Sequence, residues 1–272
     1  MRLNIDYDVE RQGGWTASMV AQNVERPGLS VRDSTFVASG VVTNAKIASQ
    51  RQFTFATRGQ LDGLIIDDPN VAKAVGSSAS FQGDGNWQAG QPIVLDQLKL
   101  LSHALDLSTS GKLTGLTYTG VTQLALKELA AFSGLAQRPL EGQADLQADG
   151  EVDFLVGGFN INLDGTARKI SLASDALDGL LKSNVLLSGN VQRNQNGLEF
   201  ERLRLGNAQF HTALNGSYAT KTSNLEATVK IHDLVALSDQ AQGLLAVNLS
   251  TTGEDEIHNI KVTTQLPYFC CH

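Results

Sequence analysis

Cysteine is almost absent from the sequence. Cys270 and Cys271 are the two cysteines, and they stand side by side before the terminal His272. Disulfide bonds therefore cannot hold the fold together. Zinc sites usually draw four ligands from separated positions, and adjacent thiolates fit a tetrahedron poorly. We predict no metal site, and we interpret residues 268–272 as an irregular tail at a truncation end.

Proline and aromatic residues are also scarce. The 272 residues include 5 prolines and 26 glycines, and 6% are aromatic. This balance suits a chain that turns often and builds regular strands between its turns. The 42% hydrophobic content is enough to bury a core, which excludes a disordered tail.

No concentrated basic region and no long apolar run occurs. The net charge is −7 with Lys and Arg dispersed, so no nucleic-acid partner is predicted, because such binding needs a basic face that displaces counterions from phosphate. The start, MRLNIDYDVERQGG, lacks the pattern of a signal peptide, and no run approaches the roughly 18 apolar residues that span a bilayer. We expect either a cytoplasmic protein or an internal piece of a longer one.

Catalytic motifs are missing as well. There is no HExxH, GxSxG or P-loop sequence, and the acids Asp67 and Asp68 stand beside a proline, where a turn explains them better than a carboxylate pair. We predict no enzyme activity, no catalytic residue and no cofactor. The internal histidines are widely separated: His103, His211, His232 and His258.

Alternation of apolar and polar residues is the main positive signal. In FTFATRG, Phe53, Phe55 and Thr57 share one side, and GGFNINLDGTARKI alternates in the same way from Phe159 to Ala167. Such strands have one wet and one dry face. The repetition of this pattern predicts a long antiparallel meander.

LSGNVQRNQNGLEFERLRL shows how the meander turns and bends. Asn196-Gly197 is a hairpin signal because both residues tolerate positive φ. After Phe200 the apolar parity changes to Leu203 and Leu205, which predicts a bulge or bend near Glu201-Arg202.

Three segments break the period of two. Residues 121–139 place apolar residues on one side of a helix, which Gly134 and Pro139 would end. Residues 171–183 show the same pattern over about two turns, with Asp175 near the start. Residues 234–242 suggest a single helical turn. These helices are too few and too short to cover the whole sheet.

Related segments recur along the chain. LEGQADLQADGEVDF, LSGNVQRNQNGLEF and LNGSYATKTSNLEATVKI share an apolar residue, a glycine, a strand, a polar turn and an apolar strand. Their irregular spacing indicates a degenerate supersecondary repeat. Two interpretations stay open: opposed dry faces could fill the interior of a sandwich or barrel, or a curling sheet could leave a lengthwise apolar groove.

These segments resemble the repeating periplasmic region of the TamB family, in the wider AsmA-like group, over residues 100–267 and less closely before that. The resemblance implies an all-β fold with a few short helices, whose long curled antiparallel sheet forms an apolar groove (β-taco-like), continuous over residues 1–267. It implies a hydrophobic conduit for phospholipid transport and outer-membrane protein assembly. It also implies periplasmic localisation with an inner-membrane anchor, acyl chains as cargo, and a TamA-like Omp85 outer-membrane partner.

This chain lacks the expected anchor and the partner-binding end, which favours a fragment whose membrane contact runs through absent parts. Two alternatives stay open: β-augmentation of outer-membrane strands at a sheet edge, and a structural β module of a secreted adhesin. The predicted groove lining is Leu146, Val152, Phe154, Phe159, Ile161, Leu163, Leu187, Val191, Leu198, Phe200, Val229, Ile231, Val247, Leu249, Ile260 and Val262.

Overall fold

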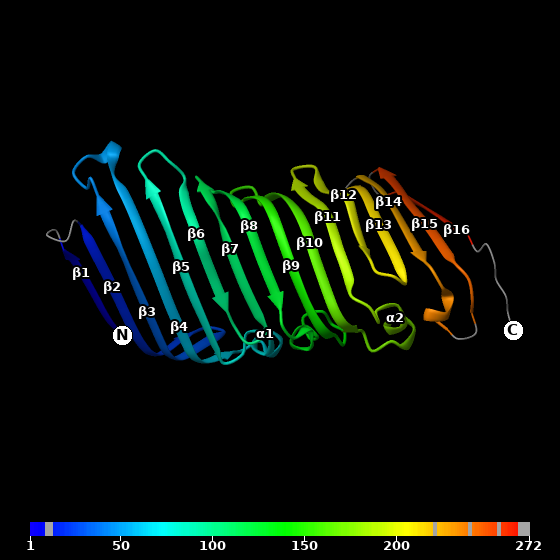
Figure 1. The fold of residues 1–272 in the computed structure, drawn as a ribbon, viewed down its shortest axis with the longest axis horizontal. Helices are drawn as coiled ribbons and strands as arrows, with labels where there is room; N and C mark the ends of the chain where they lie inside the picture. Colours follow the sequence, from blue (N-terminus) through cyan, green and yellow to red (C-terminus); the bar gives the residue numbers. More distant parts are fainter. Residues whose placement is uncertain (9–12, 220–221, 239–240, 255–256, 266–272) are drawn as a thin grey trace. The chain divides into compact units, whose positions relative to one another are not determined.

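The computed structural model describes residues 1–8, 13–219, 222–238, 241–254 and 257–265. These residues form an all-β protein whose strands follow chain order in the sheet and are antiparallel to their neighbours (Figure 1). The predicted fold class is therefore confirmed, as an open antiparallel meander with a few short helices. The predicted tail, residues 268–272, lies outside the described part.

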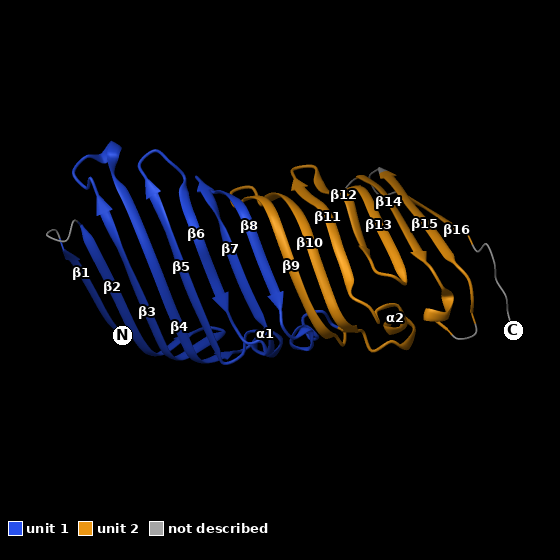
Figure 2. Cartoon of the chain, in the orientation of Figure 1, with its two compact units in different colours: residues 1–137 blue, residues 138–272 orange. Residues whose placement is uncertain are grey.

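The chain divides into two compact units, Met1–Gln137 and Arg138–His272 (Figure 2). The prediction that residues 1–267 form one continuous repeating segment stays a prediction. Unit 1 contains β1 (Arg2–Asp8), β2 (Gly14–Arg26), β3 (Leu29–Thr43), β4 (Gln52–Ile66), β5 (Ser78–Gln88), β6 (Ile93–Leu101), β7 (Leu105–Thr114) and β8 (Thr117–Leu126), with the helices η1 (Ala48–Gln50), α1 (Pro69–Val75) and η2 (Leu129–Phe132). Unit 2 contains β9 (Glu141–Asp153), β10 (Gly158–Ser171), β11 (Val185–Asn194), β12 (Gly197–Gly206), β13 (Phe210–Tyr218), β14 (Thr222–Ile231), β15 (Leu245–Glu254) and β16 (Ile257–Gln265), with α2 (Asp175–Leu180) and η3 (Leu234–Ala236).

Both local predictions for the strand pair β11–β12 are confirmed. The pair closes as a hairpin in which Asn194 lies opposite Gly197. The register of β12 with β13 shifts between Phe200 and Leu203, and Arg202 has a φ of 50°. This irregularity lets apolar residues before and after it share one face.

The predicted helix over 121–139 is wrong in its first half. Val121 and Leu124 belong to β8, where they lie opposite Ser110 and Leu107 of β7, and only η2 at Leu129–Phe132 is helical. The apolar residues of such a segment can fit one side of a helix or one face of a strand. Here the hydrogen bonds to β7 favour the strand. The β-branched Thr117, Val121 and Thr122 also suit a pleated surface.

The other two helix predictions are confirmed in shorter form. Asp175 begins α2, and η3 is a single turn at Leu234–Ala236, although residues 239–240 of the predicted segment lie outside the described part. The expected apolar stripe of α2 is only partly correct, because Leu180 is buried whereas Leu177 is exposed.

Sequence reasoning missed α1. Asp68, read before as an acid beside a turn, caps this helix: its Oδ1 accepts hydrogen bonds from the backbone N–H groups of Asn70 (2.8 Å) and Val71 (3.3 Å). Pro69 occupies the first turn and Gly76 ends the helix with a φ of 78°. An N-cap aspartate, a proline and a terminal glycine are the usual signals of a helix.

The buried apolar cluster of unit 2 lies where α2 meets the sheet. Leu180 of α2 packs with Val185, Phe210 and Ile231, and residues of η3 lie against this cluster. The helices thus cover the apolar residues at this end of the strands.

Replacing Phe210 by Ala should lower the unfolding free energy of unit 2 by about 3 kcal/mol or more, because the ring is 8% exposed and its removal leaves a cavity. Denaturant titration followed by circular dichroism, with amide hydrogen exchange of β11, β13 and β14, measures the loss. Leu186→Ala is the control, since Leu186 is 57% exposed. Equal losses in the two variants would contradict the importance of this cluster.

Asp178 should make unit 2 less stable in acid. The carboxylate of Asp178 accepts a hydrogen bond from the backbone N–H of Leu172 (2.8 Å) and another from the hydroxyl of Ser171 (2.8 Å). Both hydrogen bonds lower the pKa of Asp178, and the one from Leu172 has the larger effect. A lowered folded-state pKa contributes stability above the ordinary carboxyl pKa of about 3.9, and that stability disappears as the pH falls through the folded-state pKa. Asp178→Asn should therefore be less stable than wild type at neutral pH, with a difference that shrinks in acid. Thermal unfolding of the two proteins across pH measures this difference, and a difference that stays constant into acid would contradict the role of the Asp178 carboxylate.

Candidate functional site: the apolar faces of the two units

Strand pairing collects the apolar residues of unit 2 on one side, called here the apolar face. Residues directly opposite each other in an antiparallel pair point to the same face. Ile161 of β10 lies opposite Val191 of β11, which lies opposite Phe200 of β12. The registers from β9 to β16 place all but one of the predicted groove residues on this face: Leu146, Val152, Phe159, Ile161, Leu163, Leu187, Val191, Leu198, Phe200, Val229, Ile231, Val247, Leu249, Ile260 and Val262.

Phe154 is the predicted residue that the structure places elsewhere. It lies in the turn between β9 and β10 and is 63% exposed. The carboxylate of Asp153 organises this turn by accepting hydrogen bonds from the N–H groups of Leu155 (2.8 Å) and Val156 (3.2 Å). The strand alternation ends at Asp153, so Phe154 does not continue the apolar face.

The opposite side of unit 2 is polar, and the contrast is clearest in β9. There Gln143, Asp145, Gln147, Asp149 and Glu151 are exposed, whereas every residue between them is half-buried. The second group consists of Ala144, Leu146, Ala148 and Gly150. The polar side of β9 is therefore suited to contact with water, and its apolar side is not.

The apolar face is partly rather than fully buried. Ile161 and Leu163 in the middle of β10 are half-buried, and no large side chain in the described part of the chain is fully buried. In a closed sandwich, side chains at strand centres would be covered by a facing sheet. Leu180 of α2 packs with Val185, Phe210 and Ile231, so the helices cover the apolar face at this end of the strands.

Unit 1 has an apolar face of its own, and it is rich in aromatic rings. Phe53 and Phe55 alternate along β4 as predicted, and their ring centroids are 6.0 Å apart. Trp15 of β2 stacks on Phe53 with centroids 5.4 Å apart and an interplanar angle of 11°. Phe36 of β3 meets Phe81 of β5 at 5.9 Å.

Glycines make these ring contacts possible. Gly59 of β4 lies opposite Phe36 on one side and Phe81 on the other, so the two rings meet above it. A Cβ at Gly59 would clash with the ring of Phe81. Gly40 of β3 lies opposite Trp15, and a Cβ there would clash with the backbone oxygen of Thr54 and lie 2.7 Å from the indole nitrogen of Trp15. The face is therefore built from large rings laid over residues without side chains.

Sequence reasoning did not select the aromatic residues of unit 1 apart from Phe53 and Phe55. The segment SASFQGDGNWQ, which forms β5, hides its apolar alternation because Gly83 and Gly85 occupy positions on the apolar face. Counting glycine as a member of the dry side in strands would have revealed Phe81 and Trp87 as well.

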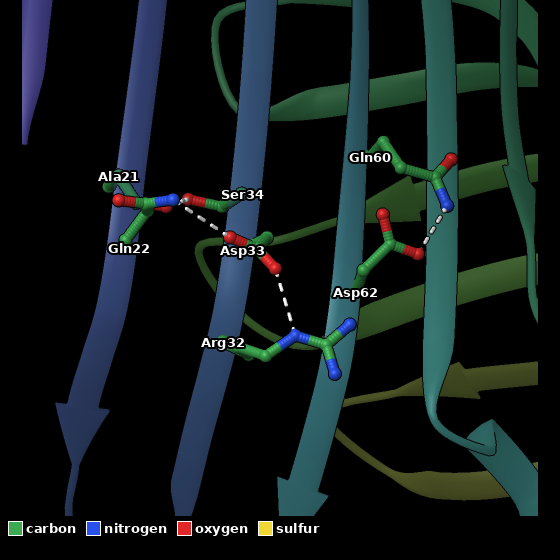
Figure 3. Close-up of polar contacts among 7 residues, drawn as sticks. All are labelled: Ala21, Gln22, Arg32, Asp33, Ser34, Gln60 and Asp62. Carbon is green, nitrogen blue, oxygen red and sulfur yellow. Dashed lines mark hydrogen bonds and ion pairs between the residues drawn. The ribbon is translucent and has the colours of Figure 1, made fainter.

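The polar side of unit 1 carries hydrogen-bonded charges. Arg32 of β3 is paired with Asp33 at 2.9 Å, and Figure 3 shows the guanidinium of Arg32 on the side of Asp62 in β4. The hydrogen bond from Arg32 and the one from Gln22 lower the pKa of Asp33. The pair is exposed, so it organises the surface rather than adding much stability.

Potential metal ligands do not gather in the described part of the chain. No group of three or more His, Cys, Asp or Glu residues could hold a metal ion there, and Cys270, Cys271 and His272 lie outside it. His103 Nε2 lies 3.5 Å from a carboxylate oxygen of Glu128. None of the described helices is long and apolar enough to cross a bilayer.

Comparison with family models, with curated proteins and with solved structures gave no match to this chain. The two apolar faces are therefore interpreted from their own geometry.

Gly59→Ala should destabilise unit 1 by about 1–3 kcal/mol, because the new methyl group displaces the Phe81 ring from its place beside Phe36. The same substitution in a Phe81→Ala background should cost nothing further, because the space above Gly59 is then open. Denaturant unfolding followed by tryptophan fluorescence suits the test, since both tryptophans are in unit 1. An equal cost in the two backgrounds would show that Gly59 is needed for another reason.

Proposed function

We propose that the chain is a segment of a TamB-like hydrophobic conduit that carries phospholipid acyl chains along its apolar faces. One observation supports this proposal above all. In unit 2 an apolar face lies on one side of an open sheet, is half-buried along β9 and β10, and is backed by an exposed polar side.

The energetic need for such a surface is large. Each CH₂ group that leaves a membrane for water costs about 0.8 kcal/mol, so an acyl chain of about sixteen carbons costs on the order of 12 kcal/mol to carry unaided. Contact with an apolar face removes much of that cost and requires no catalytic group. The lack of a metal cluster among the described residues is compatible with this role but does not argue for it.

The composition of the faces also fits a mobile apolar cargo. Positions that alternate with large side chains are occupied by Gly150, Ala148 and Gly165 in unit 2 and by Gly59 and Gly83 in unit 1. The small residues leave shallow depressions between the large side chains. A flexible acyl chain can lie against this surface in many positions. Such a surface offers van der Waals contact without selecting one bound position.

A structural β module with a filled interior is a weaker interpretation. It requires strand-centre side chains to be fully covered, and no large side chain in the described ranges is. The proposed periplasmic location, the inner-membrane anchor and the TamA-like outer-membrane partner depend on the resemblance to the TamB family alone.

A second candidate function, β-augmentation, is favoured by the edge of unit 1. Among the described strands, β1 is hydrogen-bonded to β2 and to no other, and its Leu3 and Ile5 are 56% and 67% exposed. An edge strand of this kind can pair with an extended segment of another polypeptide. This function would use the edge backbone, whereas lipid carriage would use the apolar face.

Ile161→Asp should abolish lipid binding by unit 2, because it places a charge in the middle of the apolar face. Asn162→Asp is the matched control, since it adds the same charge to the neighbouring position on the polar side. Purified proteins would be incubated with a fluorescent phospholipid, and bound lipid would be counted by fluorescence and by mass spectrometry. Circular dichroism of both variants checks that the sheet is retained.

Photo-crosslinking gives the complementary readout. A photoreactive residue at Leu163, Val191 or Val229 should capture lipid, and one at Asp164 or Asn190 should not. Equal capture of lipid from the two sides would contradict the proposal. Capture of polypeptide along β1 without lipid on the apolar face would favour β-augmentation instead.

A further inference from the structure

The polar side of unit 1 is hollowed between the strands β3 to β6 and the helix α1. Two adjoining hollows, of about 630 Å³ and 370 Å³, share Gln60, Ser80 and Leu101 in their walls. Gln60, Ser80 and Leu101 occupy the strand positions that alternate with the aromatic face, and Gly59 and Phe81 of that face also border the smaller hollow. The polar side chains of this surface are not used in the proposed lipid carriage.

The Lys and Arg side chains in the walls of the two hollows are Arg58, Lys99 and Lys73, and all of them are positive. Arg58 and Lys99 line the smaller hollow, and Lys73 and His103 line the larger one. No aspartate or glutamate lines either of them, although the chain has 28 acidic and 21 basic residues. The remaining polar lining consists of hydroxyl and amide groups from Thr35, Gln60, Ser77, Ser78, Ser80, Gln82 and Ser102.

Strand pairing holds Arg58 and Lys99 on either side of Gln82. Arg58 lies opposite Gln82 in the β4–β5 pair, and Gln82 lies opposite Lys99 in the β5–β6 pair. Two interstrand spacings separate their backbones by about 10 Å. Neither Arg58, Lys73 nor Lys99 has an ion-pair partner among the described residues.

The nearest carboxylates are engaged or stand outside the hollows. Asp62 accepts a hydrogen bond from Gln60 at 3.0 Å, and Figure 3 shows it beside Arg32. Asp106 is paired with Lys127 at 2.8 Å, and Glu128 is paired with His103. Asp84 follows Gln82 by two residues on β5 and lies opposite Ala56 and Gln97, beyond the lining of the smaller hollow.

We propose that this hollow binds phosphate groups, with Arg58 and Lys99 as the charged contacts and Lys73 at its far end. A guanidinium offers two parallel N–H donors to a phosphate, and an ammonium adds a point charge. Hydroxyl and amide groups around them supply neutral donors. The spacing of the two cations suits a ligand with more than one phosphoryl group, because each cation can then contact a different group.

Unit 2 contains a hollow of the same character, of about 780 Å³. Arg204 and His211 line it together with Ser183, Ser188, Asn184 and Asn207, and no carboxylate lines it. Lys230 lies directly opposite His211 in the β13–β14 pair. The recurrence of a cation-lined, hydroxyl-rich hollow on the polar side argues against a chance arrangement of surface charges in unit 1.

Titration of the full chain with inorganic pyrophosphate, followed by ¹⁵N NMR, tests the proposal. Saturable shifts are expected for amides of β4, β5, β6 and α1. The double variant Arg58→Gln, Lys99→Gln should weaken the affinity at least about tenfold, since two charge-assisted contacts are lost. The control double variant Lys46→Gln, Lys112→Gln removes the same charge outside the hollow and should leave the affinity within about twofold, as expected for a screened distant charge.

Vesicle binding separates the two sources of phosphate. The protein would be sedimented with phosphatidylcholine vesicles, with and without phosphatidic acid. If the Arg58→Gln, Lys99→Gln variant loses binding only to the vesicles that contain phosphatidic acid, the ligand is a lipid headgroup. Pyrophosphate binding without vesicle binding would identify a soluble phosphorylated ligand. Absence of saturable shifts with pyrophosphate, or equal weakening in both double variants, would overturn the proposal. The lipid-carriage tests use the apolar face of unit 2, so the two proposals can fail separately.

Discussion

The pleat of the antiparallel strand is the constraint on which the rest of this structure depends. Successive side chains point to opposite faces, and hydrogen bonding to the neighbouring strands keeps that assignment in step from strand to strand. A shift of one residue would turn the whole apolar set of a strand toward water. The register of β10 with β9 and β11 keeps Ile161 opposite Gly150 and Val191, and this pairing maintains a dry and a wet side.

The irregular positions serve the same constraint. Between Phe200 and Leu203 the apolar pattern changes parity, and a shift in register with a positive φ at Arg202 returns both residues to one face. Glycine has a related role in unit 1, where Gly59 and Gly40 remove a side chain so that rings from the neighbouring strands can meet. Bulges thus preserve the face, and glycines shape its surface.

The two sides of the sheet support two different proposals. The half-buried apolar faces suit an acyl chain, which needs area and no fixed geometry. The polar side of unit 1 suits a phosphate-bearing ligand, which needs separated cations and hydrogen-bond donors. Both proposals follow from the same alternation, because a strand that sends Phe81 to one side sends Ser80 and Gln82 to the other.

The sequence by itself determined the all-β class, the meander, the hairpin at Asn194–Gly197 and the bend after Phe200, because period-two alternation and turn residues are local signals. It also determined which residues of unit 2 share a face, from Leu146 to Val262, with Phe154 as the one misplaced member. The tertiary structure decided the rest. Pairing with β7 made residues 117–126 a strand, although a helical stripe was also present. The rings of Trp15, Phe36 and Phe81 met across glycines that conceal the alternation. Arg58 and Lys99, which are distant in sequence, came to flank Gln82. These outcomes depend on which strand lies beside which, and a pattern within one segment carries no information about its neighbour.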